Sequence, residues 1–102
     1  MEKRIPHYSL PEIHAQMLTE RDMNLTITAL AGIRSAGMSQ ADALSVIKKL
    51  ERKNFYKSMT THGDSSIWQD VYHSRWKGID LYIKFQRHEE YFVISFKERN
   101  GE

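Results

Sequence analysis

Lysine, tyrosine, glutamine and hydroxyl side chains occur together in the second half of this chain, from Asn54 to Glu98. This set can cleave RNA without a metal, because RNA carries its own nucleophile. The 2′-OH attacks the adjacent phosphorus once a group takes its proton, and the protein adds in-line positioning and stabilisation of the charge on phosphate. A tyrosine beside lysines can have its pKa lowered by their charge. A glutamine can hold a phosphate oxygen or a base edge without titrating.

The most distinctive stretch runs from Asn54 to Tyr72, where two aromatic-rich, strand-like runs flank a polar turn. Core-forming sequence is degenerate, since many apolar choices fill the same volume. The polar string Tyr56–Thr61, followed by Trp68-Gln-Asp-Val-Tyr72, is not degenerate in that way. We therefore interpret this stretch as part of a functional site.

Each of these residues also has an ordinary interpretation. Tyr82 can belong to an amphipathic strand, with Lys84 and Lys97 as its solvated neighbours, and Lys57 can be a surface lysine. Asp70 can be a ligand or a base, although surface and turn carboxylates are far commoner. Basic groups interleaved with aromatic rings suit single-stranded RNA, but a solvated sheet face stays open as the alternative.

The composition suits one domain over residues 1–102, with 40% hydrophobic and 27% charged residues. No apolar run approaches the roughly 20 residues of a membrane span, and no apolar stretch follows the basic start as in a signal peptide. Zero cysteines exclude disulfides, thiolate nucleophiles and cysteine-based zinc sites. We expect a cytoplasmic protein, and the net charge of +2 leans mildly towards polyanionic partners.

Common hydrolase and metal motifs are absent from the sequence. It contains no Gly-x-Ser-x-Gly elbow, no Gly-rich phosphate loop and no His-Glu-x-x-His. His62 and His73 could meet across adjacent strands, but no cysteine joins them. We expect both to be exposed turn residues, and we expect no metal site.

The first half of the chain predicts helices and the second half strands, which indicates an α+β fold. Ser9 has the spacing of a helix cap and predicts a helix to about Leu18. A second helix is expected over Thr26–Ala36, ended by Gly37. Ser39 is expected to cap a third helix.

From Phe55 onward the period of the pattern changes to two, as in half-buried antiparallel strands. The opposite face is expected to present Tyr82, Lys84, Ser95 and Lys97. The parity of residues 67–72 stays open, because neither alternating set is cleanly apolar. Six apolar residues are expected to pack under the helices: Leu81, Ile83, Phe85, Phe92, Ile94 and Phe96.

Several motifs resemble one family in order and spacing. They are Phe55-Tyr-Lys-Ser-Met-Thr-Thr61, Ile67-Trp-Gln-Asp-Val-Tyr72, Tyr82-x-Lys84 and Ser95-Phe-Lys-Glu98, and the opening Met1-Glu-Lys-Arg-x-Pro-His7 is similar as well. The chain thus resembles the MqsR toxins of bacterial toxin–antitoxin modules. The likeness covers nearly the whole chain and is strongest from Phe55 onward.

This resemblance implies a RelE-like α+β fold with helices packed on an antiparallel sheet. It implies an endoribonuclease that needs no metal, cofactor or ribosome and cuts mRNA at short GC-containing triplets. It also implies a partner, a zinc-containing antitoxin that binds DNA. The segments 62–63, 73–76 and 87–90, which we expect to be turns, depart from the family and leave triplet preference and antitoxin contacts open.

The resemblance also implies site residues. By matching position, Lys57, Gln69 and Tyr82 fall where the principal active residues lie, and Lys97 is a fourth candidate. We expect Tyr82 to handle the 2′-OH proton, Lys57 and Lys97 to stabilise the phosphorane, and Gln69 to orient phosphate or base. The side chains expected to line the RNA path are Tyr56, Met59, Arg75 and Lys84.

Two other functions remain possible on the residues alone. One is a non-catalytic RNA-binding module, in which the aromatic rings stack on bases and the lysines meet phosphates. The other is a protein-interaction domain whose basic face meets an acidic partner. Incubation with a defined mRNA separates the three functions. Cleavage would support the endonuclease, binding without cleavage would support the RNA-binding module, and neither cleavage nor binding would support the protein-interaction domain.

Overall fold

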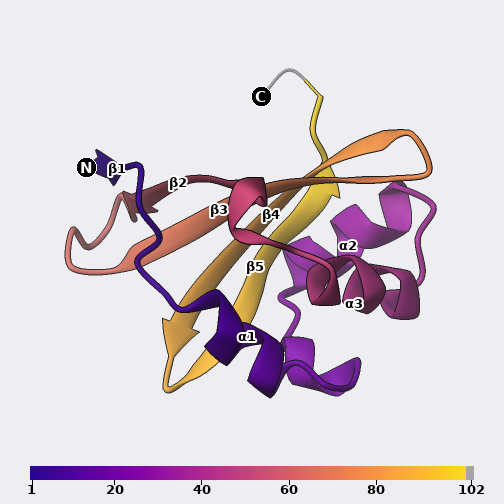
Figure 1. Ribbon diagram of the computed structural model, residues 1–102, viewed down its shortest axis with the longest axis horizontal. Helices are drawn as coiled ribbons and strands as arrows, with labels where there is room; N and C mark the ends of the chain where they lie inside the picture. Colours follow the sequence, from indigo (N-terminus) through magenta and orange to yellow (C-terminus); the bar gives the residue numbers. More distant parts are fainter. Residues whose placement is uncertain (101–102) are drawn as a thin grey trace.

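A computed structural model describes residues 1–100 and shows three α-helices packed against a five-stranded antiparallel sheet (Figure 1). The expected α+β fold is confirmed. The helices are α1 (Leu10–Gln16), α2 (Ile27–Ser35) and α3 (Gln40–Lys48), with 3₁₀ turns η1 (Arg21–Met23) and η2 (Arg52–Asn54). The strands are β1 (Glu2–Lys3), β2 (Phe55–Thr60), β3 (Trp68–Trp76), β4 (Ile79–His88) and β5 (Glu90–Glu98).

The strands lie in the sheet in chain order, β1-β2-β3-β4-β5, and every neighbouring pair is antiparallel. The turn between β3 and β4 is formed by Lys77 and Gly78, which have φ angles of 46° and 82°. Two positive φ angles twist a tight hairpin in the direction that its strands require, and glycine adopts such an angle without strain. Glu89, with φ of 64°, turns the chain between β4 and β5.

All three helices begin at capped positions, and the caps predicted at Ser9 and Ser39 are confirmed. The Ser9 side chain caps α1, and the Thr26 hydroxyl accepts a hydrogen bond from the first turn of α2. Ser39 and Asp42 form a reciprocal capping box at α3, in which each side chain accepts from the other's main-chain N–H. These bonds satisfy donors that a helix start leaves without partners. Helix α1 ends at Gln16, earlier than expected.

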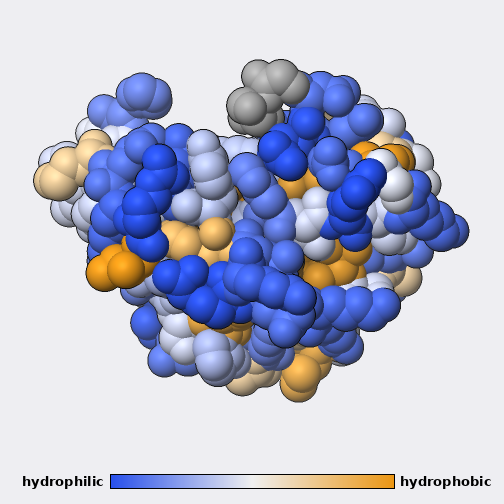
Figure 2. All heavy atoms as spheres, turned by 45° about the horizontal axis from the view of Figure 1, so that its top comes forward, coloured by the Kyte–Doolittle hydropathy of each residue, from blue (hydrophilic) through white to orange (hydrophobic). Residues whose placement is uncertain are grey.

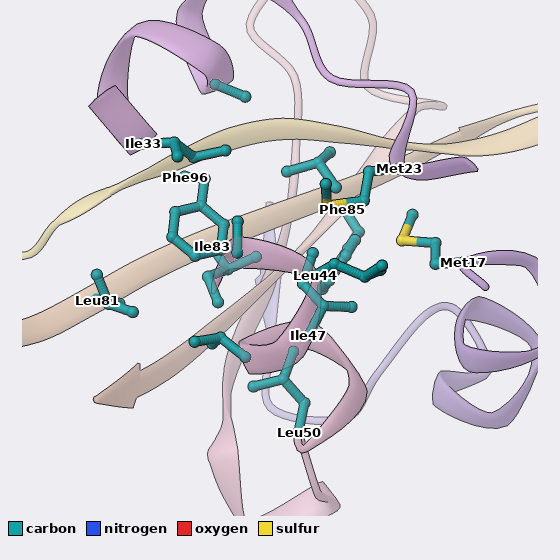
Figure 3. Close-up of a cluster of buried hydrophobic side chains, with 14 of the residues drawn as sticks. Met17, Met23, Ile33, Leu44, Ile47, Leu50, Leu81, Ile83, Phe85 and Phe96 are labelled. Carbon is teal, nitrogen blue, oxygen red and sulfur yellow. The ribbon is translucent and has the colours of Figure 1, made fainter. Parts of the chain in front are cut away.

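The core lies between the helices and one face of the sheet (Figure 3). Leu81, Ile83, Phe85 and Phe96 are fully buried in it, as the alternation predicts. Apolar side chains from all three helices and from η1 meet them, and burial of this kind is the main driving force of folding. The helical side of the cluster includes Ile13, Met17, Met23, Ile33, Leu44 and Ile47.

A bulge in β5 overturns part of the predicted core. Ser95 pairs with Lys84, but Val93 pairs with the next residue of β4, so Ile94 is an extra residue in the ladder. A bulge reverses the alternation on one side of it, and Val93 is therefore fully buried in the core. The prediction that Phe92 and Ile94 pack under the helices is wrong, since both are only half-buried.

Helix α2 packs directly on β5 through Gly32. A Cβ atom placed on Gly32 would lie 2.0 Å from the main-chain oxygen of Phe96. No side chain fits at that distance, so glycine lets the helix approach this end of the strand. Among residues 1–100, no helix combines the length and apolar composition needed to cross a membrane.

Tyr72 is fully buried between the rings of Phe55 and Phe85, and within residues 1–100 its hydroxyl has no hydrogen-bond partner. Burial, followed by the charge of Asp70, raises the pKa of Tyr72 to about 12. The pKa of Tyr91 is also raised to about 12, chiefly by burial, but its hydroxyl donates to Glu12 Oε1 at 2.7 Å. The two tyrosines thus share a pKa and differ in hydrogen bonding.

We expect Tyr72→Phe to raise the free energy of unfolding at pH 7 by about 1 kcal/mol, because it removes a buried hydroxyl without a partner. Tyr91→Phe, the matched control, should lower it by a similar amount. An unfolded tyrosine ionises near pH 10, so the stability that each raised pKa contributes is complete below pH 10 and is lost between about pH 10 and 12. Urea titrations at pH 7 and 11 measure both effects. Equal changes in the two variants would contradict this account.

Candidate active site

The parity of β3 follows from its register with β4. Asp70 pairs with Phe85 and Tyr72 pairs with Ile83, so these residues of β3 face the helices. Gln69 and the alternate residues Val71 and His73 therefore face the other way. We call this side of the sheet, which the helices do not cover, the open face.

All eight predicted site residues lie on the open face. Lys57 pairs with Val71, which pairs with Lys84, and His73 pairs with Tyr82, which pairs with Lys97. The sheet therefore brings residues from four strands to one surface. The eight are Tyr56, Lys57, Met59, Gln69, Arg75, Tyr82, Lys84 and Lys97.

Two amines surround the ring of Tyr82. The Nζ of Lys97 lies 5.1 Å and the Nζ of Lys84 lies 6.0 Å from the ring centroid, which is within the range of cation–π attraction. Tyr82 is only 8% exposed, although it lies outside the core cluster. Side chains of the open face therefore cover most of the Tyr82 ring.

A row of rings crosses the open face from β2 to β4. The ring of Tyr56 stacks on His73 at 4.3 Å, and the centroid of His73 lies 6.2 Å from that of Tyr82. His73 is half-buried in the middle of β3. The expectation that residues 73–76 form a turn, with His73 exposed in it, is therefore wrong, whereas His62 does lie in the exposed β2–β3 turn.

The N-terminal segment supports the β2 side of the face. Glu2 Oε1 and Lys57 Nζ are 2.7 Å apart, and this contact holds the pKa of Glu2 below its usual value. The guanidinium of Arg4 lies 5.3 Å from the ring centroid of Tyr56. Lys57 is therefore already paired with a carboxylate in the free protein.

Gln69 lies apart from the Tyr82 group. Its Nε2 donates to Gln86 Oε1 at 2.8 Å, so the two amides lie side by side on β3 and β4. Gln69 is four residues along β3 from His73, or about 13 Å at the usual rise per residue. Lys57 and Lys97 are three strands apart, about 14 Å at the usual strand spacing. Of the four candidate catalytic residues, Tyr82 and Lys97 thus form an adjacent pair, while Lys57 and Gln69 each lie apart from it.

Asp70 is neither a ligand nor a surface carboxylate, because it is fully buried on the helix side of β3. Its carboxylate accepts from the main-chain N–H of His7 at 3.0 Å and of Tyr8 at 2.9 Å, and from the Ser58 hydroxyl at 2.6 Å. Buried carboxylates need such partners. Asp70 therefore ties the N-terminal segment to the sheet.

The site is a surface and not a cavity. Within residues 1–100 the structure contains no pocket and no group of three or more histidine, aspartate and glutamate side chains that could hold a metal ion. In the view of Figure 2, hydrophilic side chains cover most of the surface, and the hydrophobic areas between them are small and separate. Such a surface suits an extended, polar ligand.

Residues 5–98 match the family described as "Motility quorum-sensing regulator, toxin of MqsA". The chain belongs to the MqsR toxin family. The chain is 35% identical over 99 residues to the "mRNA interferase toxin MqsR" of Escherichia coli (strain K12). This alignment covers 97% of this chain and 100% of that protein. The resemblance inferred from the sequence motifs is confirmed.

The motifs shared with the MqsR family leave out His73 and Gln86, which the structure adds to the open face. Strand alternation could have found both, since His73 shares the parity of Gln69 and Gln86 shares that of Tyr82. The parity of β3 was not decidable from the sequence because a polar residue, Asp70, occupies the buried position.

We expect Asp70→Ala to lower the free energy of unfolding by about 3 kcal/mol, because two main-chain N–H groups and one hydroxyl lose a charged acceptor. The amides of His7 and Tyr8 should exchange with solvent much faster. Urea denaturation and amide hydrogen exchange measure these changes. Asp64→Ala, in the exposed β2–β3 turn, is the control and should cost at most about 1 kcal/mol. Unchanged exchange at His7 would show that Asp70 does not hold the segment.

Proposed function

We propose that this chain is an mRNA endonuclease, the toxin of a toxin–antitoxin pair, that cuts single-stranded RNA without metal or ribosome at short GC-containing triplets. The observation that carries the proposal is the open face, where Lys84 and Lys97 lie around Tyr82. The name of the Escherichia coli relative, "mRNA interferase toxin", supports the same activity. The spread of these side chains over four neighbouring strands also favours a polymer over a small substrate.

The reaction is attack of the 2′-OH on the adjacent phosphorus, with loss of the 5′-oxygen of the next nucleotide. Tyr82 handles the proton of the 2′-OH, and Lys97 with Lys84 stabilises the charge that builds on the phosphate oxygens. These groups are preorganised, because strands position them and the ring of Tyr82 is almost buried. The products are a 2′,3′-cyclic phosphate and a free 5′-OH.

Lys57 and Gln69 act on either side of this centre. Lys57 lies on β2, two strands from Tyr82, so its amine meets the phosphate backbone from the β2 side. It adds positive charge to the transition state together with Lys97. Gln69 holds a neighbouring phosphate or base edge, because amides make hydrogen bonds without titrating. Tyr56, with 43% of its surface exposed, offers a ring on which a base can stack.

The partner of the toxin is an antitoxin, as the family description "toxin of MqsA" supports. We infer that this antitoxin contains zinc and binds DNA. The toxin has no cysteine, so zinc bound by thiolates in the complex would belong to the antitoxin. A neighbouring reading frame that encodes a cysteine-rich, DNA-binding protein would support this part of the proposal, and purified antitoxin without zinc would contradict it.

The decisive experiment incubates the purified protein with a defined mRNA in EDTA. We expect cleavage with 2′,3′-cyclic phosphate ends, and no cleavage where the 2′-OH before the scissile bond is replaced by hydrogen. Tyr82→Phe, Lys57→Ala and Gln69→Ala should each lower kcat/KM by about 100-fold, as removal of one catalytic contact does. His88→Ala, at the exposed end of β4, is the control. Full activity of all three variants would contradict the assignment of the site residues. Intact RNA with a shifted gel band would contradict cleavage and would leave RNA binding as the function.

Glu2→Gln tests how Lys57 meets the substrate. A phosphate must compete with the Glu2 carboxylate for the Lys57 amine, so we expect the variant to bind RNA about two- to fivefold more tightly. The gain should shrink at high salt, because screening weakens both contacts. Glu51→Gln, which removes the same charge from the exposed pair with Lys53, is the control. Filter binding at two salt concentrations measures the effect, and weaker binding would mean that Glu2 positions Lys57.

A further inference from the structure

The bulge in β5 creates a feature of the open face that no sequence motif marks. It turns Phe92 away from the helices and places it beside Gln86 in the register of β4 and β5. On the other side, Gln69 pairs with Met59 of β2. The hydrogen bond between Gln69 and Gln86 joins the two halves. We call Met59, Gln69, Gln86 and Phe92 the amide row.

The amide row has the composition of a base-binding surface. All four side chains are half-buried, so the sheet fixes them and still leaves part of each accessible. Two amides lie between a flexible thioether and an aromatic ring. Apolar groups can contact the face of a nucleobase, while amides bond to its edge.

The hydrogen bond between the amides fixes which groups face a ligand. Gln69 Nε2 donates to Gln86 Oε1, which uses one of two donors of Gln69 and orients both side chains. The Oε1 of Gln69 and the NH2 group of Gln86 then offer an acceptor and a donor next to each other. A paired acceptor and donor discriminates among bases, because each base edge carries its own pattern of donors and acceptors.

The distance from Tyr82 sets which base the amide row can contact. On β4, Tyr82, Lys84 and Gln86 succeed one another at every second residue, so Gln86 lies about 13 Å from Tyr82 along the strand. The lysine between them can hold the intervening phosphate. An RNA strand laid along β4 therefore brings a flanking nucleotide, and not the nucleotide that reacts, to the amide row.

We propose that the amide row is a base-recognition subsite for single-stranded RNA, in which Gln86 determines specificity and Phe92 stacks on the same base. This inference rests on the proposed function for its substrate class and gives roles to Gln86 and Phe92, which the proposed cleavage does not use. Phe92→Ala should weaken RNA binding about tenfold whatever the base, since stacking tolerates any base. Gln86 should instead determine which base is preferred.

The test uses oligoribonucleotides that carry each of the four bases at each position around the cleavage site, with a 2′-deoxy nucleotide that prevents cleavage. We expect the protein to prefer one base at one flanking position, and Gln86→Leu to reduce that preference about tenfold while preferences elsewhere stay unchanged. Gln86→Glu keeps the acceptor for Gln69 but loses the NH2 donors, so it should also alter the preferred base. Gln40→Leu, on α3, is the matched control and should change nothing.

Four outcomes decide whether the amide row recognises a base. A uniform loss of affinity in both Gln86 variants would overturn the inference, because Gln86 would then support the fold or Gln69 alone. An unchanged base preference in both variants, or no binding of any oligonucleotide by the unaltered protein, would overturn it as well. Base preference set by Gln86 in a protein that leaves cleavable RNA intact would uphold the inference while the proposed cleavage fails. Urea denaturation of each variant confirms that it is folded.

Discussion

The buried carboxylate of Asp70 is the constraint on which the open face depends. A charged group at a fully buried position of β3 is costly unless it is hydrogen-bonded, and the main-chain N–H groups of His7 and Tyr8 with the Ser58 hydroxyl satisfy it. Because strand side chains alternate, Asp70 pointing inwards means that Gln69 and Val71 point outwards. A shift of one residue in the register of β3 would exchange its buried and open faces and would expose the partners of the Asp70 carboxylate.

The same contact links the start of the chain to the site. With His7 and Tyr8 held against β3, the preceding residues can pair with the edge of β2, and Glu2 then lies within 2.7 Å of Lys57. The N-terminal motif therefore acts through geometry, since it covers the sheet edge and sets the charge next to Lys57. Edge coverage also protects a strand from pairing with other chains. Glu2 and Lys3, at the start of the N-terminal motif, are thus part of the sheet.

Local rules predicted much of this structure from the sequence. The caps at Ser9 and Ser39 are confirmed because capping depends on neighbours in the chain. Leu81, Ile83 and Phe85 were placed correctly because β4 alternates without interruption. Four motifs in order were enough to identify the family. A structural property that depends only on residues close together in the chain can be predicted directly from the sequence.

The errors have one physical source, which is register between strands. Nothing in the sequence near Ile94 marks an extra residue, so the alternation of β5 predicts that Phe92 lies in the core. The parity of β3 depends on partners of Asp70 that lie more than 60 residues away in the chain. His73 was placed in a turn for the same reason, since only the pairing with Tyr82 shows that the strand continues. Long-range pairing is where single-sequence reasoning loses information.

The charges of the open face favour a polyanion over other ligands. Lys57 lies 2.7 Å from a carboxylate oxygen of Glu2 and Arg75 lies 3.2 Å from one of Asp80, and the amines of Lys84 and Lys97 lie 6.0 Å and 5.1 Å from the centroid of the Tyr82 ring. Positive side chains gathered on one surface attract the phosphates of a polyanion, because opposite charges lower each other's energy. In the proposed cleavage, negative charge develops on the phosphate beside Tyr82, so the two amines there would bind the transition state more strongly than the substrate.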